Sequence, residues 1–265
     1  MESTLKRTWA EISLDNLTHN FETIRRQVGP KAKLLGVVKA DAYGHGAVRV
    51  AKHLERLGAG YLAVSNLDEC EELRVNGITL PILMLGFTPA DQAERILKND
   101  MTQAVPNLAI AEAYSSAAVH AGGTMKVHIK LDTGMHRLGF DPEHDMEELI
   151  DRLKHQNAII PRSVFSHFVG SDSDGFDEFS AHQFALFEKG STELQAAFQH
   201  HIIRHMDNSA GIEHFPERQM DMCRLGLGLY GIDSRNNHII NNVSTLKTTI
   251  LQIHNVAASE TVGYS

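Results

Sequence analysis

Apolar and polar residues alternate along this chain with two different periods. From residue 15 onward, short apolar runs alternate with longer segments in which apolar residues recur at helical spacing. Short apolar runs bounded by turn residues are typical of buried strands, and the longer segments are typical of amphipathic helices. The runs predict eight strands, at residues 34–39, 61–64, 82–85, 102–105, 125–131, 161–167, 202–206 and about 221–225.

Helices are predicted between most of these strands. Asp15 can cap the first helix, whose apolar face begins at Leu17 and Phe21. Glycines follow several of the later helices, and Pro89 stands where a first helical turn favours proline. These later helices are predicted at residues 47–57, 67–75, from 88 onward, 108–121, 143–154, 176–199 and about 209–214.

Strands joined by helical crossovers form a parallel sheet, and eight such units over about 250 residues close into a (β/α)8 barrel of the TIM type. A doubly wound open α/β sheet is the competing architecture. We favour the barrel because candidate functional residues fall at the carboxyl-terminal ends of five different strands, and barrel enzymes build their sites from the loops on that face. The candidates are Lys39, Lys130 with Arg137, His167, Ser209 and Arg224.

Two segments fall outside the barrel pattern. Residues 5–14 read as a strand before the first helix, and residues 243–258 are rich in β-branched types without a helical period. We therefore expect a barrel domain at 15–240, with 1–14 and 241–265 as partial strands of a second β domain. Most of that second domain is expected to lie outside this sequence.

Composition narrows the class of protein. A net charge of −8 argues against nucleic acid as a partner. Cys70 and Cys223 form neither a metal motif nor a disulfide framework, which agrees with a reducing cytoplasm. The chain start lacks a signal peptide's apolar core, and no apolar run approaches the roughly 20 residues of a membrane span. The 16 histidines are scattered, so we expect no metal site.

Lys39 ends the first apolar run, and a turn with two glycines follows. Lysine is rarely buried without a partner or a function, although a lysine at a strand end can also extend its amine into water. Burial favours the neutral amine, which is the nucleophile that forms a Schiff base. An aldehyde cofactor such as pyridoxal 5'-phosphate (PLP) uses such a lysine.

The ten residues from Val37 to Gly46, VVKADAYGHG, resemble the PLP-lysine motif of the alanine racemases. PLP decarboxylases of the same fold share only the VKA-like core. The resemblance implies that Lys39 holds PLP and that Tyr43 reaches the cofactor phosphate.

Two further strings continue the resemblance. Residues 130–139, KLDTGMHRLG, are similar to a racemase string whose arginine lies near the cofactor's phenolic oxygen, which implies that role for Arg137. The resemblance also implies a carbamate on Lys130, whose negative charge would orient Arg137. His167, in FSHF, corresponds to a histidine that stacks on the PLP ring. On their own, these strings also fit a solvated loop and a core histidine.

The phosphate side is implied by two more strings. Residues 208–211, NSAG, would cap a short helix in any protein, and in the racemases such a string binds phosphate, which assigns Ser209. Residues 224–231, RLGLGLYG, resemble a racemase string that has proline where this chain has leucine. The resemblance implies that Arg224 bonds the pyridine nitrogen and that the amides of Gly226 and Leu227 approach the phosphate.

The last string, VGY at 262–264, resembles the racemase segment that bears the second catalytic base. Racemisation needs acid–base groups on both faces of the α-carbon. The resemblance implies that Tyr264 faces Lys39 of the other subunit in a homodimer.

The sequence thus predicts a cytoplasmic, PLP-dependent isomerase that interconverts L- and D-alanine and supplies D-alanine for peptidoglycan. We expect little activity from this chain alone, because Tyr264 stands at its end. A racemase of broader or serine preference, a fold-related decarboxylase and a PLP-binding protein without turnover are the alternatives. The decarboxylase fits the strings around Lys39 and Arg137 less well.

Overall fold

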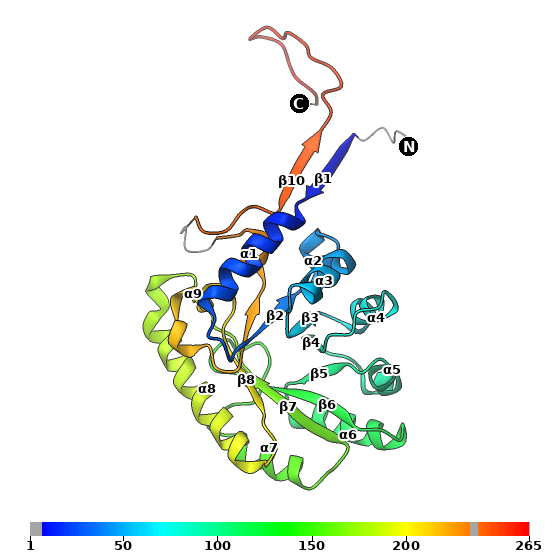
Figure 1. Ribbon diagram of the computed structural model, residues 1–265, viewed down its shortest axis with the longest axis vertical. Coiled ribbons are helices and arrows are strands. Elements are labelled where there is room, and N and C mark those ends of the chain that lie inside the picture. The colour runs from blue at the N-terminus through cyan, green and yellow to red at the C-terminus, as the bar shows by residue number, and fades with distance from the viewer. Residues whose placement is uncertain (1–6, 234–237, 265) are drawn as a thin grey trace.

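The main body of the protein is a barrel of eight parallel strands (Figure 1). The computed structural model describes residues 7–233 and 238–264. The barrel strands are β2 (Lys33–Val37), β3 (Tyr61–Val64), β4 (Ile82–Met84), β5 (Thr102–Val105), β6 (Met125–Lys130), β7 (Ile159–Phe165), β8 (Ile203–His205) and β9 (Met222–Leu225).

The strand order is β8-β7-β6-β5-β4-β3-β2-β9, so β8 and β9 are the two ends of the sheet. Two backbone hydrogen bonds join these ends. The N–H of Asp221 donates to the Arg204 carbonyl at 3.1 Å, and the N–H of Arg224 donates to the Asp207 carbonyl at 3.0 Å. The predicted barrel is confirmed, and the open sheet is excluded by this closure.

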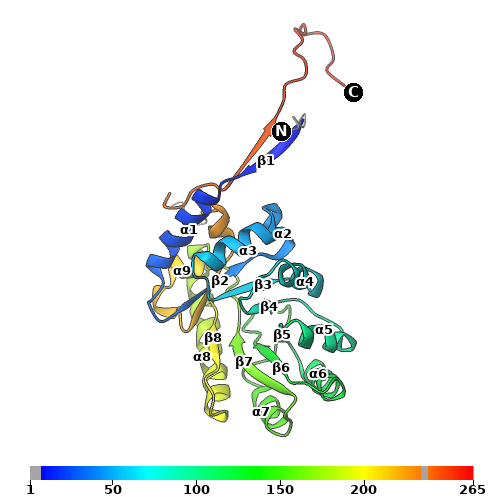
Figure 2. The ribbon, with the colours of Figure 1, turned by 45° about the vertical axis from the view of Figure 1, so that its right-hand side comes forward.

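Helices surround the strands on the outside of the barrel (Figures 1 and 2). They are α1 (Leu14–Gln27), α2 (Lys39–Gly44), α3 (Ala47–Arg56), α4 (Leu67–Val75), α5 (Ala93–Lys98), α6 (Leu108–His120), α7 (Met146–Lys154), α8 (Asp177–Ala197) and α9 (Ser209–His214). Short 3-10 turns lie at η1 (Ala90–Gln92), η2 (Asp174–Phe176), η3 (Pro216–Arg218) and η4 (Leu227–Tyr230). None of the helices in the described ranges is long and apolar enough to cross a membrane.

Hydrogen bonds from nearby side chains explain why the starts of two helices differ from the prediction. Ser13, not Asp15, caps α1, because its hydroxyl accepts the backbone N–H of Asn16 at 3.1 Å. Helix α7 begins three residues after its predicted start at 143. There Asp141 accepts the N–H of Glu143 at 2.7 Å, a turn that competes with the helix.

Two cores lie on the two sides of the barrel wall. The larger one fills the space between strands and helices, and the smaller one lies inside the barrel. Aromatic residues Tyr61 and Phe165 belong to the inner core. Polar side chains are buried beside them inside the barrel, namely His128, Ser163, His205 and Arg224.

A two-stranded ribbon extends away from the barrel (Figures 1 and 2). Strands β1 (Thr8–Ile12) and β10 (Ser244–Thr248) pair antiparallel, with Thr8 opposite Thr248. Of the predicted strand segment 243–258, only β10 is a strand, and Ile250 and Ile253 beyond it are 73% and 80% exposed. Residues 5 and 6 of the predicted N-terminal strand lie outside the described residues.

Candidate active site

A cavity of about 570 Å³ opens at the carboxyl-terminal mouth of the barrel, where parallel-barrel enzymes place their sites. Its lining comes from the carboxyl ends of all eight barrel strands and the segments that follow them. All of the predicted site residues except one line it: Lys39, Tyr43, Lys130, Arg137, His167, Ser209, Arg224, Gly226 and Leu227.

Lys39 begins an unusual turn rather than ending a strand. Strand β2 stops at Val37, and Lys39, two residues later, is half-buried rather than buried as the apolar run suggested. The four residues from Ala40 to Tyr43 all have left-handed dihedrals, with φ between 51° and 54°. Such a turn is unfavourable for residues with a Cβ, so its surroundings must impose it.

Several contacts hold this left-handed turn. The Asp41 carboxylate accepts the N–H of Ala47 at 2.6 Å and so connects the turn to the start of α3. His45 Nδ1 lies 2.9 Å from the carbonyl of Ala42, and the His45 ring packs on Tyr230 at 4.6 Å between centroids. These contacts consequently hold the backbone next to Lys39 in place at the cavity wall.

The segments that follow β8 and β9, next to β2 in the barrel, carry a set of hydroxyl and amide groups. The Ser209 hydroxyl accepts the N–H of Gly226 at 2.9 Å and the N–H of Gly228 at 3.1 Å. A side chain at Gly226 would place a Cβ 3.4 Å from the hydroxyl of Tyr43. The Ser209 hydroxyl accepts these amides and keeps its own proton, so it forms with the Tyr43 hydroxyl a small polar cradle that can donate to an oxyanion.

Arg224 is buried at the centre of the site, and the barrel uses both of its terminal nitrogens. Nη1 donates to Nδ1 and the carbonyl of His205 at 2.9 and 3.3 Å. Nη2 reaches the carbonyls of Ser166 and Met206 and Nδ1 of His167, at 2.8 to 2.9 Å. Within the described chain, Nε–H is left as the donor without a partner. Burial lowers the pKa of Arg224 to about 10, which leaves it charged at neutral pH.

The histidines beside Arg224 are neutral. Burial, with the charge of Arg224, holds the pKa of His167 and of His205 well below the usual value. A guanidinium can only donate hydrogen bonds, so Nδ1 of each ring must accept. The histidines are scattered along the sequence, and for that reason His205 and His128 were not predicted as site residues. Their inward positions on strands 202–206 and 125–131 were the available signal.

Lys130 is buried beside these groups. Its amine donates to the Leu131 carbonyl at 3.0 Å and lies 5.2 Å from the centre of the Phe165 ring. Burial, reinforced by the charge of Arg224, lowers the pKa of Lys130 to about 7, so a large fraction of the amine is neutral near neutral pH. Arg137, in the loop after β6, is exposed and lines the cavity.

Tyr264 is the predicted site residue that the structure does not bring to the cavity. Its side chain is fully exposed, and it lies in the segment that follows the β1–β10 ribbon (Figure 2). Within one chain it therefore does not face Lys39.

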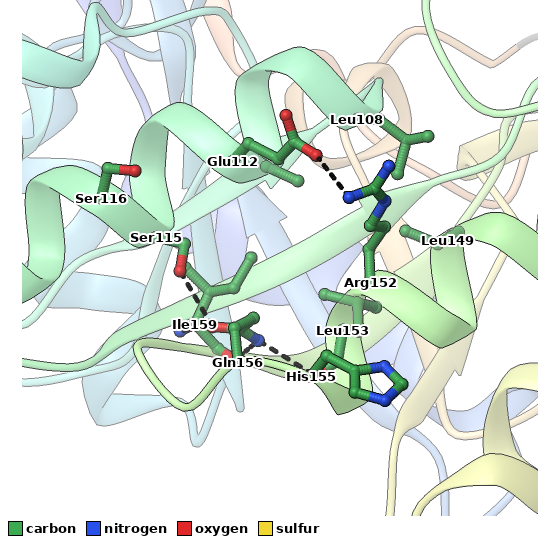
Figure 3. A pocket seen from close by; sticks show the side chains of 11 residues that line it. Leu108, Glu112, Ser115, Ser116, Leu149, Arg152, Leu153, His155, Gln156 and Ile159 are labelled. Carbon is green, nitrogen blue, oxygen red and sulfur yellow. Dashed lines mark hydrogen bonds and ion pairs between the residues drawn. The ribbon is translucent and has the colours of Figure 1, made fainter.

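A second pocket, of about 360 Å³, lies between α6 and α7 on the outside of the barrel (Figure 3). Ser115 there donates to Gln156 at 3.2 Å, and Arg152 lies 3.6 Å from Glu112. Because its polar groups pair with one another, the cavity at the barrel mouth is the stronger candidate.

A barrel mouth lined by a lysine, an oxyanion cradle and a buried arginine is typical of barrel enzymes that hold an aldehyde cofactor. The comparison with known proteins specifies the family. Residues 12–234 match the family described as alanine racemase, N-terminal domain. The chain belongs to the alanine racemase family, whose members depend on PLP.

Individual relatives agree with this assignment. Alanine racemase 1 of Clostridium acetobutylicum is 39% identical over 98% of this chain and 68% of its own length. Alanine racemase 2 of Caldanaerobacter subterraneus is 36% identical over the same shares. A solved alanine racemase of Clostridium difficile 630 superposes with a TM-score of 0.91 at 37% identity, and the match covers 99% of this chain and 70% of that one. The alternatives of a broader racemase and a non-catalytic PLP protein are not favoured.

Proposed function

We propose that the cavity at the barrel mouth binds PLP and that Lys39 is one of two bases that interconvert L- and D-alanine. The observation that carries the proposal is the convergence of Lys39, the cradle around Ser209 and the free Nε–H of Arg224 on one cavity. Family membership supports alanine as the substrate.

The residues fit the cofactor group by group. The amine of Lys39 suits an aldehyde carbon. The hydroxyls of Ser209 and Tyr43 and the amides of Gly226 and Leu227 suit a phosphate. When bound, PLP supplies an electron-withdrawing ring that acidifies the α-hydrogen of an attached amino acid.

Arg224 would decide which reaction follows. Its guanidinium stays charged, so it donates a hydrogen bond to a ring nitrogen without giving up its proton. A ring nitrogen that accepts this bond remains unprotonated. We propose that this limits side reactions such as transamination, while His167 packs against the ring.

Racemisation needs a second base, and we propose Tyr264 of another copy of the chain. Support comes from the full exposure of Tyr264 on a segment outside the barrel, where a second copy can reach it. Lys39 would hold or remove the proton on one face of the α-carbon, and the tyrosine would do so on the other.

We also propose that Lys130 carries a carbamate. Only a neutral amine attacks carbon dioxide, and burial makes that form accessible to Lys130 near neutral pH. The amine nitrogen bonds to the carbon, and the nitrogen's proton passes to solvent. The resulting anion would orient Arg137 toward the phenolic side of the cofactor.

The remaining features of the proposal concern the cell and the assembly. We infer a cytoplasmic homodimer that supplies D-alanine for peptidoglycan. We propose a barrel domain at 15–240, with 1–14 and 241–265 as parts of a second β domain. Support for that division is that β1 and β10 pair with each other and not with the barrel sheet.

Borohydride reduction in saturating PLP tests the proposal. The chain should acquire a cofactor label that peptide mapping places on Lys39, and Lys39→Ala should abolish it. Lys52→Ala, at an exposed lysine of α3, is the matched control. A label that persists in Lys39→Ala, or that maps elsewhere, would contradict the assignment.

A further inference from the structure

A chain of hydrogen bonds runs through the interior of the barrel to Arg224. Nη1 of Arg224 lies 2.9 Å from Nδ1 of His205, and Nε2 of His205 lies 3.2 Å from the hydroxyl of Ser163. That hydroxyl lies 2.5 Å from Nδ1 of His128. All four side chains are buried, and three of them lie below the floor of the cavity rather than in its lining.

Arg224 fixes the direction of the first bonds in this chain. Because the guanidinium has no acceptor, Nδ1 of His205 must accept. Neutral His205 then carries its proton on Nε2, which donates to Ser163.

The direction of the hydrogen bond between Ser163 and His128 follows from the number of buried polar groups that each direction leaves unpaired. If the Ser163 hydroxyl donates to Nδ1 of His128, only the Nε2–H of His128 stays unpaired among the described residues. If His128 donated instead, both the serine proton and the Nε2 lone pair would be unpaired. Each unpaired buried group is costly, so the first arrangement is favoured.

Among the residues that the structure describes, only the Ser163 hydroxyl lies within hydrogen-bond distance of His205 Nε2. The His205 ring stacks on Phe165 at 5.1 Å, and the His128 ring meets the edge of Tyr61 at 5.9 Å. Without the Ser163 hydroxyl, a proton on Nε2 would be a buried donor without an acceptor, and this cost would offset the preference that Arg224 imposes. A proton on Nδ1 would face the N–H of Arg224, two donors with no acceptor between them.

We propose that Ser163 and His128 are positioning residues for Arg224, because they hold His205 in the tautomer that accepts from the guanidinium. The acceptor keeps the guanidinium in one plane and leaves Nε–H as its remaining donor. The importance of that donor for PLP rests on the proposed function, but the hydrogen-bonded chain itself does not.

Nitrogen-15 NMR of the chain without PLP tests this, with histidine and arginine labelled. At pH 7, His205 and His128 should both appear as neutral rings protonated on Nε2, and the Arg224 Nε–H should exchange slowly. In Ser163→Ala, His205 should become a mixture of tautomers. The Arg224 Nε–H should then exchange about tenfold faster, the factor for the loss of one ordinary hydrogen bond.

Ser191→Ala is the matched control, because Ser191 is another fully buried serine whose hydroxyl donates to a backbone carbonyl of α8. It should leave the His205 and Arg224 signals unchanged. A second pair of variants tests rescue at His128. Asparagine keeps an acceptor near the position of Nδ1, so His128→Asn should preserve the Arg224 signal, whereas His128→Leu should not.

Two results would overturn the proposal. One is a His205 protonated on Nδ1 or doubly protonated in the unmodified chain, a measurement that stands even if the variants fail to fold. The other is an Arg224 signal that is equally unchanged in Ser163→Ala and Ser191→Ala. Because these measurements need neither PLP nor turnover, their failure is distinguishable from a failure of the Lys39 labelling experiment.

Discussion

The carboxylate of Glu69 accepts the backbone N–H of Ala40 at 2.9 Å, directly beside the lysine of the site. Its second oxygen accepts the N–H of Ser65 at 2.8 Å. One side chain of α4 thus joins the segments that follow β2 and β3. The left-handed turn after Lys39 depends on such contacts, because its residues disfavour that conformation by roughly 1–2 kcal/mol each.

Glu69→Gln should therefore loosen the turn. Glutamine offers one oxygen where the structure uses two, and its amide group would meet a backbone N–H. We expect a loss of about 1–3 kcal/mol in the free energy of unfolding and faster hydrogen exchange at the Ala40 amide. Urea unfolding and amide exchange measure both quantities. Glu72→Gln, at an exposed position on the same helix, should change neither; equal behaviour of the two variants would refute the role of Glu69.

The stability of the protein should depend on His128 in acid. Burial lowers the pKa of His128 to about 3, below the value of about 6.5 in an unfolded chain. Between these values the unfolded chain binds the proton, so the free energy of unfolding falls as the pH drops below about 6.5. One such histidine contributes a slope of roughly 1.4 kcal/mol per pH unit.

Urea unfolding of His128→Asn at several pH values from 7 to 4 tests this slope. The variant should lose stability less steeply than the unmodified chain. His120→Asn, at an exposed position near the end of α6, serves as the control and should keep the original slope. Parallel pH profiles for His128→Asn and the unmodified chain would show that His128 titrates normally.

Asp207 should change the pH dependence of stability in the opposite direction to His128. Burial raises the pKa of Asp207 to about 7, and its Oδ1 has no hydrogen-bond partner in the described part of the chain. Between pH 4 and 7 the folded protein binds the proton, so this carboxyl costs stability as the pH rises. Asp207→Asn should raise the free energy of unfolding at pH 8 by about 1–3 kcal/mol and change it little at pH 4.5. An equal effect at both pH values would exclude titration as the cause.

Arg224→Lys should destabilise the protein and weaken PLP binding, although lysine keeps the positive charge. An ammonium cannot reproduce the contacts to His205, Ser166 and Met206 at once, so buried carbonyls lose their donors. We expect a loss of about 2–4 kcal/mol in unfolding free energy, together with weaker PLP binding in an absorbance titration. Arg162→Lys, at an exposed position of β7, should be nearly neutral in both. Unchanged stability and binding in Arg224→Lys would show that its hydrogen bonds matter little.

Sequence patterns predicted most of the barrel because strands and helices have local periods. Strand 61–64 and helix 67–75 have the predicted bounds. The order of the elements left an open sheet as an alternative, and the positions of the candidate site residues favoured the closed one. The site residues from Lys39 to Leu227 meet at one mouth because each lies at or after the carboxyl end of a parallel strand.

What the sequence did not reveal depends on contacts between distant segments. The left-handed turn contains no glycine from 40 to 43, and Glu69 and Tyr230 reach it from elsewhere in the chain. The bond between His128 and His205 through Ser163 joins three strands. No local period reports such contacts, and the scattered positions of the histidines concealed them.

The junction between β8 and β9 has a consequence for the evolution of this protein. Two backbone hydrogen bonds close the barrel there, and the Arg224 guanidinium also donates to the carbonyls of His205, the last residue of β8, and of Met206, which follows it. The side chain proposed to set the chemistry of the cofactor is also part of the wall that encloses it. A substitution at position 224 that changes the chemistry must also leave the barrel able to fold. Stability therefore limits which substitutions can occur there before any effect on activity can be selected.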